Sequence, residues 1–238
     1  MKKFFKKLLK LFNFEIDTAV DRGISLFGTN IRSLKSNIAH NKLKGTNILQ
    51  YCLKLKPINV LDVGAGSGKH AEIFANNGSK VLCIDYETSI YAKEFKFKNK
   101  NIQRLNLDFN NWENNKKFNL VWASHILEHQ KNIGNFLIKL INCCMEDGYV
   151  CIIVPFLHRT LWGGHLSLWT PGLLAYNIVL QGVDLSKSRI IYGYREFAII
   201  FKPLLVELPK DLTFDYGDLN KLKKFMPYNL SEGSDPWI

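Results

Sequence analysis

Residues 60–68, VLDVGAGSG, place glycine at every second position directly after an apolar run. Glycine loses more conformational freedom on folding than any other residue, so this spacing needs a structural reason. The apolar run predicts a buried strand, and the residues from Lys69 onward have the pattern of a helix. A strand, a glycine loop and a helix in this order bring backbone N–H groups close to a ligand. The stretch therefore predicts an α/β domain with a ligand site at Gly64, Gly66 and Gly68.

The alternation of strand and helix patterns continues along the chain. Short connections between such elements imply right-handed crossovers and a parallel sheet. Two late apolar runs, 188–194 and 196–203, are separated by little more than a turn and predict an antiparallel hairpin. We expect the other strands at 58–64, 80–86, 102–108, 118–125 and 149–155, and helices at 69–78, 89–98, 132–145 and 170–182.

The charge is concentrated in the first quarter of the chain. The net charge is +11, of which residues 1–56 supply 12 Lys+Arg against 3 Asp+Glu. The nearly neutral remainder argues against a broad nucleic-acid groove, so we expect no stable nucleic-acid complex. The expected division is a basic helical N-terminal cap (1–56), a central α/β domain (57–206) and a C-terminal surface segment (207–238).

The N-terminal stretch 2–12 alternates phenylalanines and leucines with lysines at helical spacing. This pattern predicts a basic amphipathic helix, which can pack on its own domain or a partner subunit, dock on an anionic membrane, or close over an anionic substrate. Lysines interrupt every apolar stretch, so neither a signal peptide nor a membrane span is expected. The expected location is cytoplasmic, with peripheral contact at the inner membrane surface through residues 1–12 as an option.

Five cysteines without a CxxC pair are expected to be reduced and buried.

Three details bear on the ligand of the glycine loop. The dinucleotide pattern GxGxxG would need glycine at position 69, where the chain has Lys69. The next strand ends in Asp85, whose carboxylate can accept hydrogen bonds from two ribose hydroxyls. The strand after that ends in Asp108 and Phe109, an acid for an adenine amino group and a ring to cover the base. Either acid can instead cap the helix that follows it.

As a set, these stretches resemble the class I S-adenosylmethionine-dependent methyltransferases, in particular their small-molecule branch. The resemblance covers about residues 57–202 and rests on VLDVGAGSG, VLCIDYE, LNLDF, FNLVWASHILEHQKN and EDGYVCIIVP, with Asn119 where an acid is common. It implies an α/β, Rossmann-like doubly wound sheet of seven strands, mostly parallel with an antiparallel last hairpin. It implies S-adenosylmethionine as cofactor, bound by Asp62, Gly64, Ala65, Gly66, Gly68, Asp85, Tyr86, Asp108, Phe109, Ala123 and Ser124.

Three histidines are candidates for a general base. His125 and His129 are spaced i and i+4 in SHILEH, and His165 lies in the WGGHLSLW loop, which we expect to cover the pocket. Each can instead be a structural histidine. A divalent metal held by Glu128, His129 and another acid is the weaker interpretation, because LEH alone is a poor signal; no metal is expected.

The acceptor is inferred from the residues near the expected lid. Aromatic residues there suit a sugar or another flat substrate, with ordinary core packing as the alternative, and Arg159 and Arg195 could hold a phosphate; the aromatic residues are Trp162, Trp169, Tyr176, Tyr192 and Tyr194. The leading expectation is O-methylation of a small anionic or nucleotide-linked acceptor, a sugar or phosphoryl intermediate of surface-glycan (polysaccharide) biosynthesis. The alternatives are a lipid or quinone methyltransferase at the membrane surface and a non-catalytic partner protein that binds S-adenosylmethionine. The sequence leaves the oligomeric state open.

Overall fold

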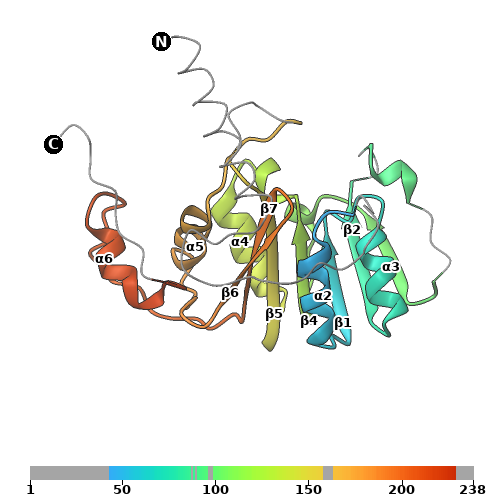
Figure 1. Cartoon of the computed structure of the whole chain (residues 1–238), viewed down its shortest axis with the longest axis horizontal. Helices are drawn as coiled ribbons and strands as arrows, with labels where there is room; N and C mark the ends of the chain where they lie inside the picture. Colours follow the sequence, from blue (N-terminus) through green and yellow to red (C-terminus); the bar gives the residue numbers. More distant parts are fainter. Residues whose placement is uncertain (1–42, 87, 89, 96–98, 158–162, 229–238) are drawn as a thin grey trace, which may run out of the picture.

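A seven-stranded sheet with helices on both faces forms the body of the protein (Figure 1). The computed structural model describes residues 43–86, 88, 90–95, 99–157 and 163–228. The strands are β1 (Asn59–Val63), β2 (Lys80–Asp85), β3 (Ile102–Asn106), β4 (Phe118–Ser124), β5 (Cys144–Pro155), β6 (Arg189–Gly193) and β7 (Glu196–Phe201). The helices are α2 (Thr46–Lys54), α3 (Lys69–Asn76), α4 (Ile133–Asn142), α5 (Pro171–Val179) and α6 (Asp218–Leu222).

The strand order is β3-β2-β1-β4-β5-β7-β6. Strands β1 to β5 are parallel, whereas β7 runs antiparallel to both β5 and β6. The predicted α/β class and antiparallel last hairpin are therefore confirmed. Because β7 runs the other way, its first residue lies at the edge where the parallel strands end.

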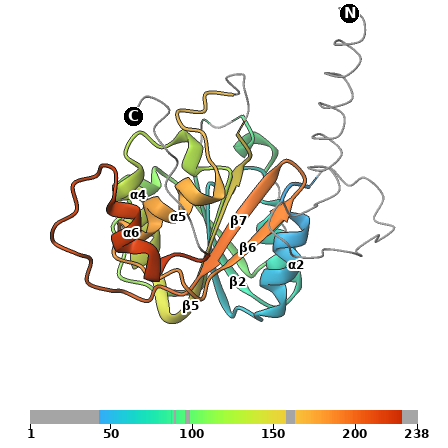
Figure 2. The ribbon, with the colours of Figure 1, turned by 60° about the vertical axis from the view of Figure 1, so that its left-hand side comes forward.

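Two apolar cores hold the helices on the sheet. Along β4, Val121 and Ala123 belong to the core under α4 and α5, while Leu120 and Trp122 belong to the core under α2 and α3. Figure 2 shows α2 on one side of the β6–β7 hairpin and α5 and α6 on the other. Both faces of the central strands are thus covered, which explains their uninterrupted apolar sequences.

Two predicted helices differ from the observed structure. Within the described part of 89–98, the helix is reduced to the 3₁₀ turn η1 (Ala92–Glu94), whose Ala92 carbonyl accepts a hydrogen bond from Arg104. The helix expected at 132–145 is α4, which ends at Asn142 because the next residues enter β5. A Cβ at Gly148 would lie 2.9 Å from the Phe118 carbonyl oxygen, so glycine lets β5 close on β4 at this irregular start.

The C-terminal segment is partly a core element. Leu222, at the end of α6, and Phe225, in the 3₁₀ turn η4 (Lys223–Phe225), are buried in the core under α5, as is Met226. The stretch 207–228 therefore packs into the domain as well as over its surface. Most of the predicted cap, including the amphipathic stretch 2–12, lies outside the described residues, so the three-part division and the membrane contact stay predictions.

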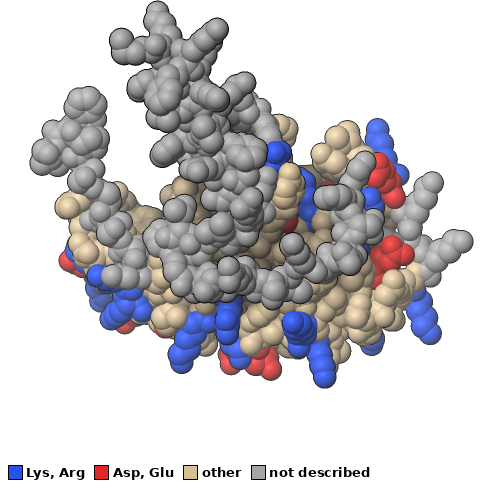
Figure 3. Space-filling view, in the orientation of Figure 1, with Lys and Arg blue, Asp and Glu red and all other residues tan. Residues whose placement is uncertain are grey.

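All five cysteines are free and buried, as expected. Within the described residues, no helix combines the length and the apolar character needed to cross a membrane. The described surface seen in Figure 3 carries basic and acidic side chains of both signs rather than one continuous basic groove.

Candidate active site

One cavity of about 870 Å³ lies where the parallel strands end. Its wall combines the glycine loop after β1, the end of β2, the turn after β3 and the turn after β4. Side chains from four separate segments can therefore meet there, as expected at the carboxyl edge of an open α/β sheet.

The glycine loop needs backbone conformations that favour glycine, and at Gly64 it has no room for a side chain. Gly64, Gly66 and Gly68 have φ of +74°, +53° and +70°, a region that favours glycine. A Cβ at Gly64 would come within 2.9 Å of the Cβ of Ile126, in the turn after β4. Gly64 and Gly66 line the cavity directly, so the ligand meets bare backbone there.

Two carboxylates stand at successive strand ends, as predicted. Asp85 lines the cavity, and its Oδ2 accepts a hydrogen bond of 2.5 Å from the Gly66 N–H. Asp108 also lines the cavity, while its Oδ1 accepts a 2.8 Å hydrogen bond from the backbone N–H of Asn110. Asp108 therefore caps the 3₁₀ turn η2 (Phe109–Asn111), the alternative role, and is at the same time part of the cavity wall.

A small apolar extension opens beside these acids. Phe109 lines it together with Val63, Ile84 and Ile126, and the Phe109 ring packs edge-on against Phe136 at 5.4 Å. Tyr86 borders both spaces; burial, and then its hydrogen bond to Asp108, raise the pKa of its hydroxyl above the usual value. The apolar extension has a volume of only about 20 Å³, so it supplies an apolar surface next to Asp108 rather than a formed site for a ring.

Several predicted cofactor residues lie behind the cavity wall. Asp62 is 1% exposed in β1, and its Oδ2 has no hydrogen-bond partner. Burial, assisted by the negative charge of Asp85, raises the pKa of Asp62 to about 8. Of the remaining predicted residues, the following also do not line the cavity: Ala65, Gly68, Ala123 and Ser124.

His125 is held by two carboxylates. Its Nε2 lies 2.7 Å from Glu196 Oε2, and its Nδ1 lies 3.3 Å from Glu128 Oε1. Burial lowers the pKa of His125, but the two carboxylates outweigh it and raise that pKa above the usual value. A carboxylate beside each ring nitrogen favours the protonated form of His125, which makes it a weaker candidate for the base that the sequence suggested.

The sequence interpretation missed Glu196 altogether. Glu196 opens the apolar strand β7, is 2% exposed, and also accepts a hydrogen bond from the Gly45 N–H. A Cβ at Gly193 would lie 2.7 Å from Glu196 Oε1, so the glycine opposite makes room for the carboxylate. A single acid at the start of an otherwise apolar strand is a signal, but only the strand order reveals its partner.

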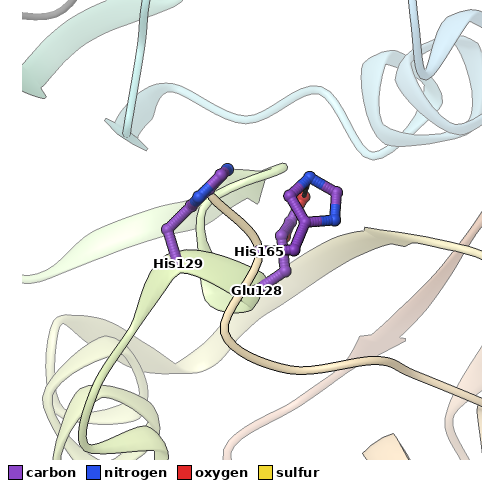
Figure 4. A group of neighbouring side chains, drawn as sticks. All are labelled: Glu128, His129 and His165. Carbon is purple, nitrogen blue, oxygen red and sulfur yellow. Dashed lines mark ion pairs between the residues drawn. The ribbon is translucent and has the colours of Figure 1, made fainter. Parts of the chain in front are cut away.

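His129 and His165 meet at a second point beside Glu128 (Figure 4). His129 is in the 3₁₀ turn η3 (Leu127–His129) and lines the cavity, whereas His165 comes from the loop before α5 and does not. The two rings are perpendicular with centroids 4.9 Å apart. Burial lowers the pKa of His165 below the usual value. The Leu166 N–H donates a 2.7 Å hydrogen bond to the Glu128 carbonyl, which fastens this loop to η3.

The aromatic residues expected over the acceptor are core or surface residues instead. Trp169 is 1% exposed, Tyr192 stacks on Phe156, and the Arg195 guanidinium lies over the ring of Tyr194. The following residues do not line the cavity: Trp169, Tyr176, Tyr192, Tyr194 and Arg195. Trp162 and Arg159 lie outside the described residues. The exposed residues Ile90 and Tyr91 form the rim instead, and no sequence pattern distinguished them.

Comparison with known proteins identifies the family. A family model described as "Methyltransferase domain" matches residues 38–178, more than half of the chain. The chain belongs to this methyltransferase family.

Its solved neighbours include a human N-acetylserotonin methyltransferase in complex with S-adenosylmethionine. That structure has a TM-score of 0.55 at 17% identity, and the match covers 66% of this chain and 51% of that chain. A Burkholderia thailandensis 1,6-didemethyltoxoflavin-N1-methyltransferase with S-adenosylhomocysteine has a TM-score of 0.54 at 16% identity, covering 85% and 90% of the two chains.

Curated relatives match this chain at low sequence identity. A "Ubiquinone biosynthesis O-methyltransferase" of Rickettsia bellii is 24% identical over 191 residues, 77% of this chain and 70% of the relative. The methyltransferase of the same description from Rickettsia typhi is 30% identical over 112 residues, only 44% of the length of each protein. These names give the expectation of glycan biosynthesis no support and agree in part with the quinone alternative.

The cofactor of this methyltransferase is S-adenosylmethionine, and the residues present fit it. Gly64 has no room for a Cβ beside Ile126, Asp85 and Asp108 line the cavity, and Phe109 adds an apolar surface beside them. Backbone N–H groups, carboxylate acceptors and an apolar surface are the kinds of group that a nucleoside-containing cofactor with an amino-acid end needs.

Proposed function

We propose that this methyltransferase methylates a hydroxyl group of a small aromatic acceptor of the phenol or quinol type. The observation that carries the proposal is that one cavity joins the glycine loop and Asp85 to the turn that bears His129. A volume of about 870 Å³ lies within the range of sites that enclose drug-sized ligands, so the cavity has room for a cofactor and a small acceptor together.

Four residues in the cofactor half of the cavity have proposed roles. In the proposed arrangement Asp85 accepts hydrogen bonds from the ribose hydroxyls, and Asp108 accepts one from the adenine amino group. Phe109 supplies an apolar surface for the base, and the bare backbone at Gly64 lets the amino-acid portion approach. The bound cofactor supplies an electrophilic methyl group on a sulfonium.

The acceptor half is formed by the turn after β4 and by the rim. Ile126 and His129 form one side, and Ile90 and Tyr91 form an apolar rim that suits an aromatic ring. The protein's contribution is then to hold the hydroxyl oxygen in line with the methyl group, an effect that is worth about 7–11 kcal/mol at best. The name of the Rickettsia bellii relative, over 77% of this chain, favours a quinone-type acceptor over a sugar.

The first test is calorimetric titration of the purified full-length protein with S-adenosylhomocysteine, with NADH as control. Transfer of a tritiated methyl group from S-adenosylmethionine to catechol is then compared with transfer to 1,2-dimethoxybenzene, which has no hydroxyl. We expect product from catechol alone. Product only from a nucleotide-linked sugar would return the acceptor to the glycan class, and S-adenosylhomocysteine binding without any product would favour the non-catalytic partner protein. Either result contradicts the proposal.

A further inference from the structure

Glu128 is a fully buried carboxylate with few polar partners. Its side chain is 0% exposed, and within the described part of the chain neither carboxylate oxygen receives a hydrogen bond, although Oε1 lies 3.3 Å from His125 Nδ1. An ionised carboxylate taken out of water costs several kcal/mol unless it is paired and hydrogen-bonded. Among the residues that the structure describes, none donates a hydrogen bond to the second oxygen, Oε2.

The contacts of Glu128 leave one of its oxygens open. Among the described residues its two ion-pair contacts are with His125 Nδ1 at 3.3 Å and with His165 Nε2 at 4.0 Å. Both contacts are made by Oε1, so Oε2 is the atom available to a further ligand.

Two imidazoles converge on this carboxylate. One donor atom from each of Glu128, His129 and His165 lies within 4.8 Å of the other two. Figure 4 shows Glu128 and His129 coming from the same turn and His165 approaching from the loop. His129 Nδ1 lies 3.4 Å from the Gly164 carbonyl oxygen. If Nδ1–H donates to that carbonyl, Nε2 keeps its lone pair, the orientation seen for histidines that bind metals.

We propose that Glu128, His129 and His165 bind a divalent transition-metal ion. Two imidazoles and one carboxylate suit Zn²⁺ and the neighbouring transition metals, whereas Mg²⁺ and Ca²⁺ prefer oxygen ligands alone. Bond lengths of about 2.0–2.2 Å place tetrahedral ligand atoms about 3.4 Å apart, so side-chain movements of about 1 Å close the site. Three protein ligands leave a fourth position open, and His129 already lines the cavity.

The ion would fasten the loop that contains His165 to the turn after β4. Backbone hydrogen bonds from Leu166 and Ser167 to the Glu128 carbonyl already hold these two segments together. A metal bond across the same contact would add side-chain links at the cavity wall. This inference concerns binding of the ion and does not depend on the nature of the methyl acceptor.

The test measures metal directly in the full-length protein. Purified protein is stripped with a chelator, reloaded with Zn²⁺, freed of excess ion and analysed for bound metal by mass spectrometry. We expect one equivalent in the wild type and in Glu146→Gln, an exposed glutamate on β5 that serves as the matched control. Glu128→Gln, His129→Gln and His165→Gln should each lower Zn²⁺ affinity about tenfold or more.

Cobalt gives a second readout that is independent of activity. Co²⁺ bound by two imidazoles and a carboxylate should show d–d absorption in the visible range, and the absorption should be lost in His129→Gln. Because His129 is exposed, this variant should fold, and retained S-adenosylhomocysteine binding verifies that it has. Wild-type protein without bound Zn²⁺ or Co²⁺ after loading overturns the proposal, as does full occupancy in the three variants. Bound metal without methyl transfer to catechol would overturn only the proposed acceptor.

Discussion

Glu196 Oε2 lies 2.7 Å from His125 Nε2, and this contact joins the first residue of β7 to the turn after β4. The other Glu196 oxygen accepts a hydrogen bond from the Gly45 N–H, just before α2. One buried carboxylate thus connects three segments that are far apart in the sequence. The local geometry at the cavity wall depends on it.

Replacing Glu196 should therefore destabilise the protein. Removing one partner of a buried ion pair typically costs about 3–5 kcal/mol, because the other charge is left unpaired. We expect Glu196→Ala to lower the free energy of unfolding in urea by an amount in that range. The exposed Glu207→Ala is the control and should change it by less than about 0.5 kcal/mol. Equal stability of the two variants would show that the contact is energetically unimportant.

Gly64→Ala should cost more than Gly78→Ala. Both glycines have positive φ, +74° and +95°, so both substitutions introduce backbone strain. Only at Gly64 does the new Cβ meet another residue, at 2.9 Å from Ile126, whereas nothing lies within 4 Å at Gly78. We expect Gly64→Ala to lose a further 1–3 kcal/mol or so of stability and to bind S-adenosylhomocysteine more weakly. Indistinguishable unfolding midpoints and affinities would exclude the close approach at Gly64.

Asp85→Asn should weaken cofactor binding without unfolding the protein. Hydrogen bonds to a charged group are worth about 1.5–3 kcal/mol, so affinity for S-adenosylhomocysteine should fall at least about tenfold. Asp147→Asn, an exposed acid on β5, is the matched control and should bind normally. Calorimetric titration of both variants measures the difference. An unchanged affinity of Asp85→Asn would refute its role in holding the ribose.

Asp62 should make stability depend on pH in an unusual direction. Its pKa is raised to about 8 in the folded protein, above the unfolded value near 3.8, so the folded state binds the proton more tightly. Between these two pH values stability therefore falls as pH rises, and above pH 8 the loss is complete. We expect wild type to lose on the order of a few kcal/mol relative to Asp62→Asn between pH 5 and 8, measured by urea unfolding. Parallel pH profiles of the two proteins would contradict this.

Local sequence patterns predicted the part of the site that is formed by residues at the ends of successive strands. The glycine loop, Asp85 and Asp108 each stand at the end of a parallel strand, and strand ends of a parallel sheet meet at one edge. The contacts around His125 were not predictable in this way, because Glu196 reaches it only through the reversed direction of β7. His165 approaches Glu128 through a loop held by backbone hydrogen bonds, which leave no residue pattern. Within the described part of 89–98 the expected helix is a single 3₁₀ turn, which Arg104 contacts through the Ala92 carbonyl and the Phe95 ring, and local helical spacing carries no sign of these contacts.

The reversed strand has a consequence for how this fold can be altered. Hairpin turns are usually where chains accept insertions, since little else depends on their length. Here the turn between β6 and β7 fixes the position of Glu196, with Gly193 directly opposite it. An epitope tag or a fused domain inserted between Gly193 and Glu196 would shift the carboxylate away from His125 and Gly45. The hairpin that looks expendable at the edge of the sheet is thus a poor place to lengthen this chain.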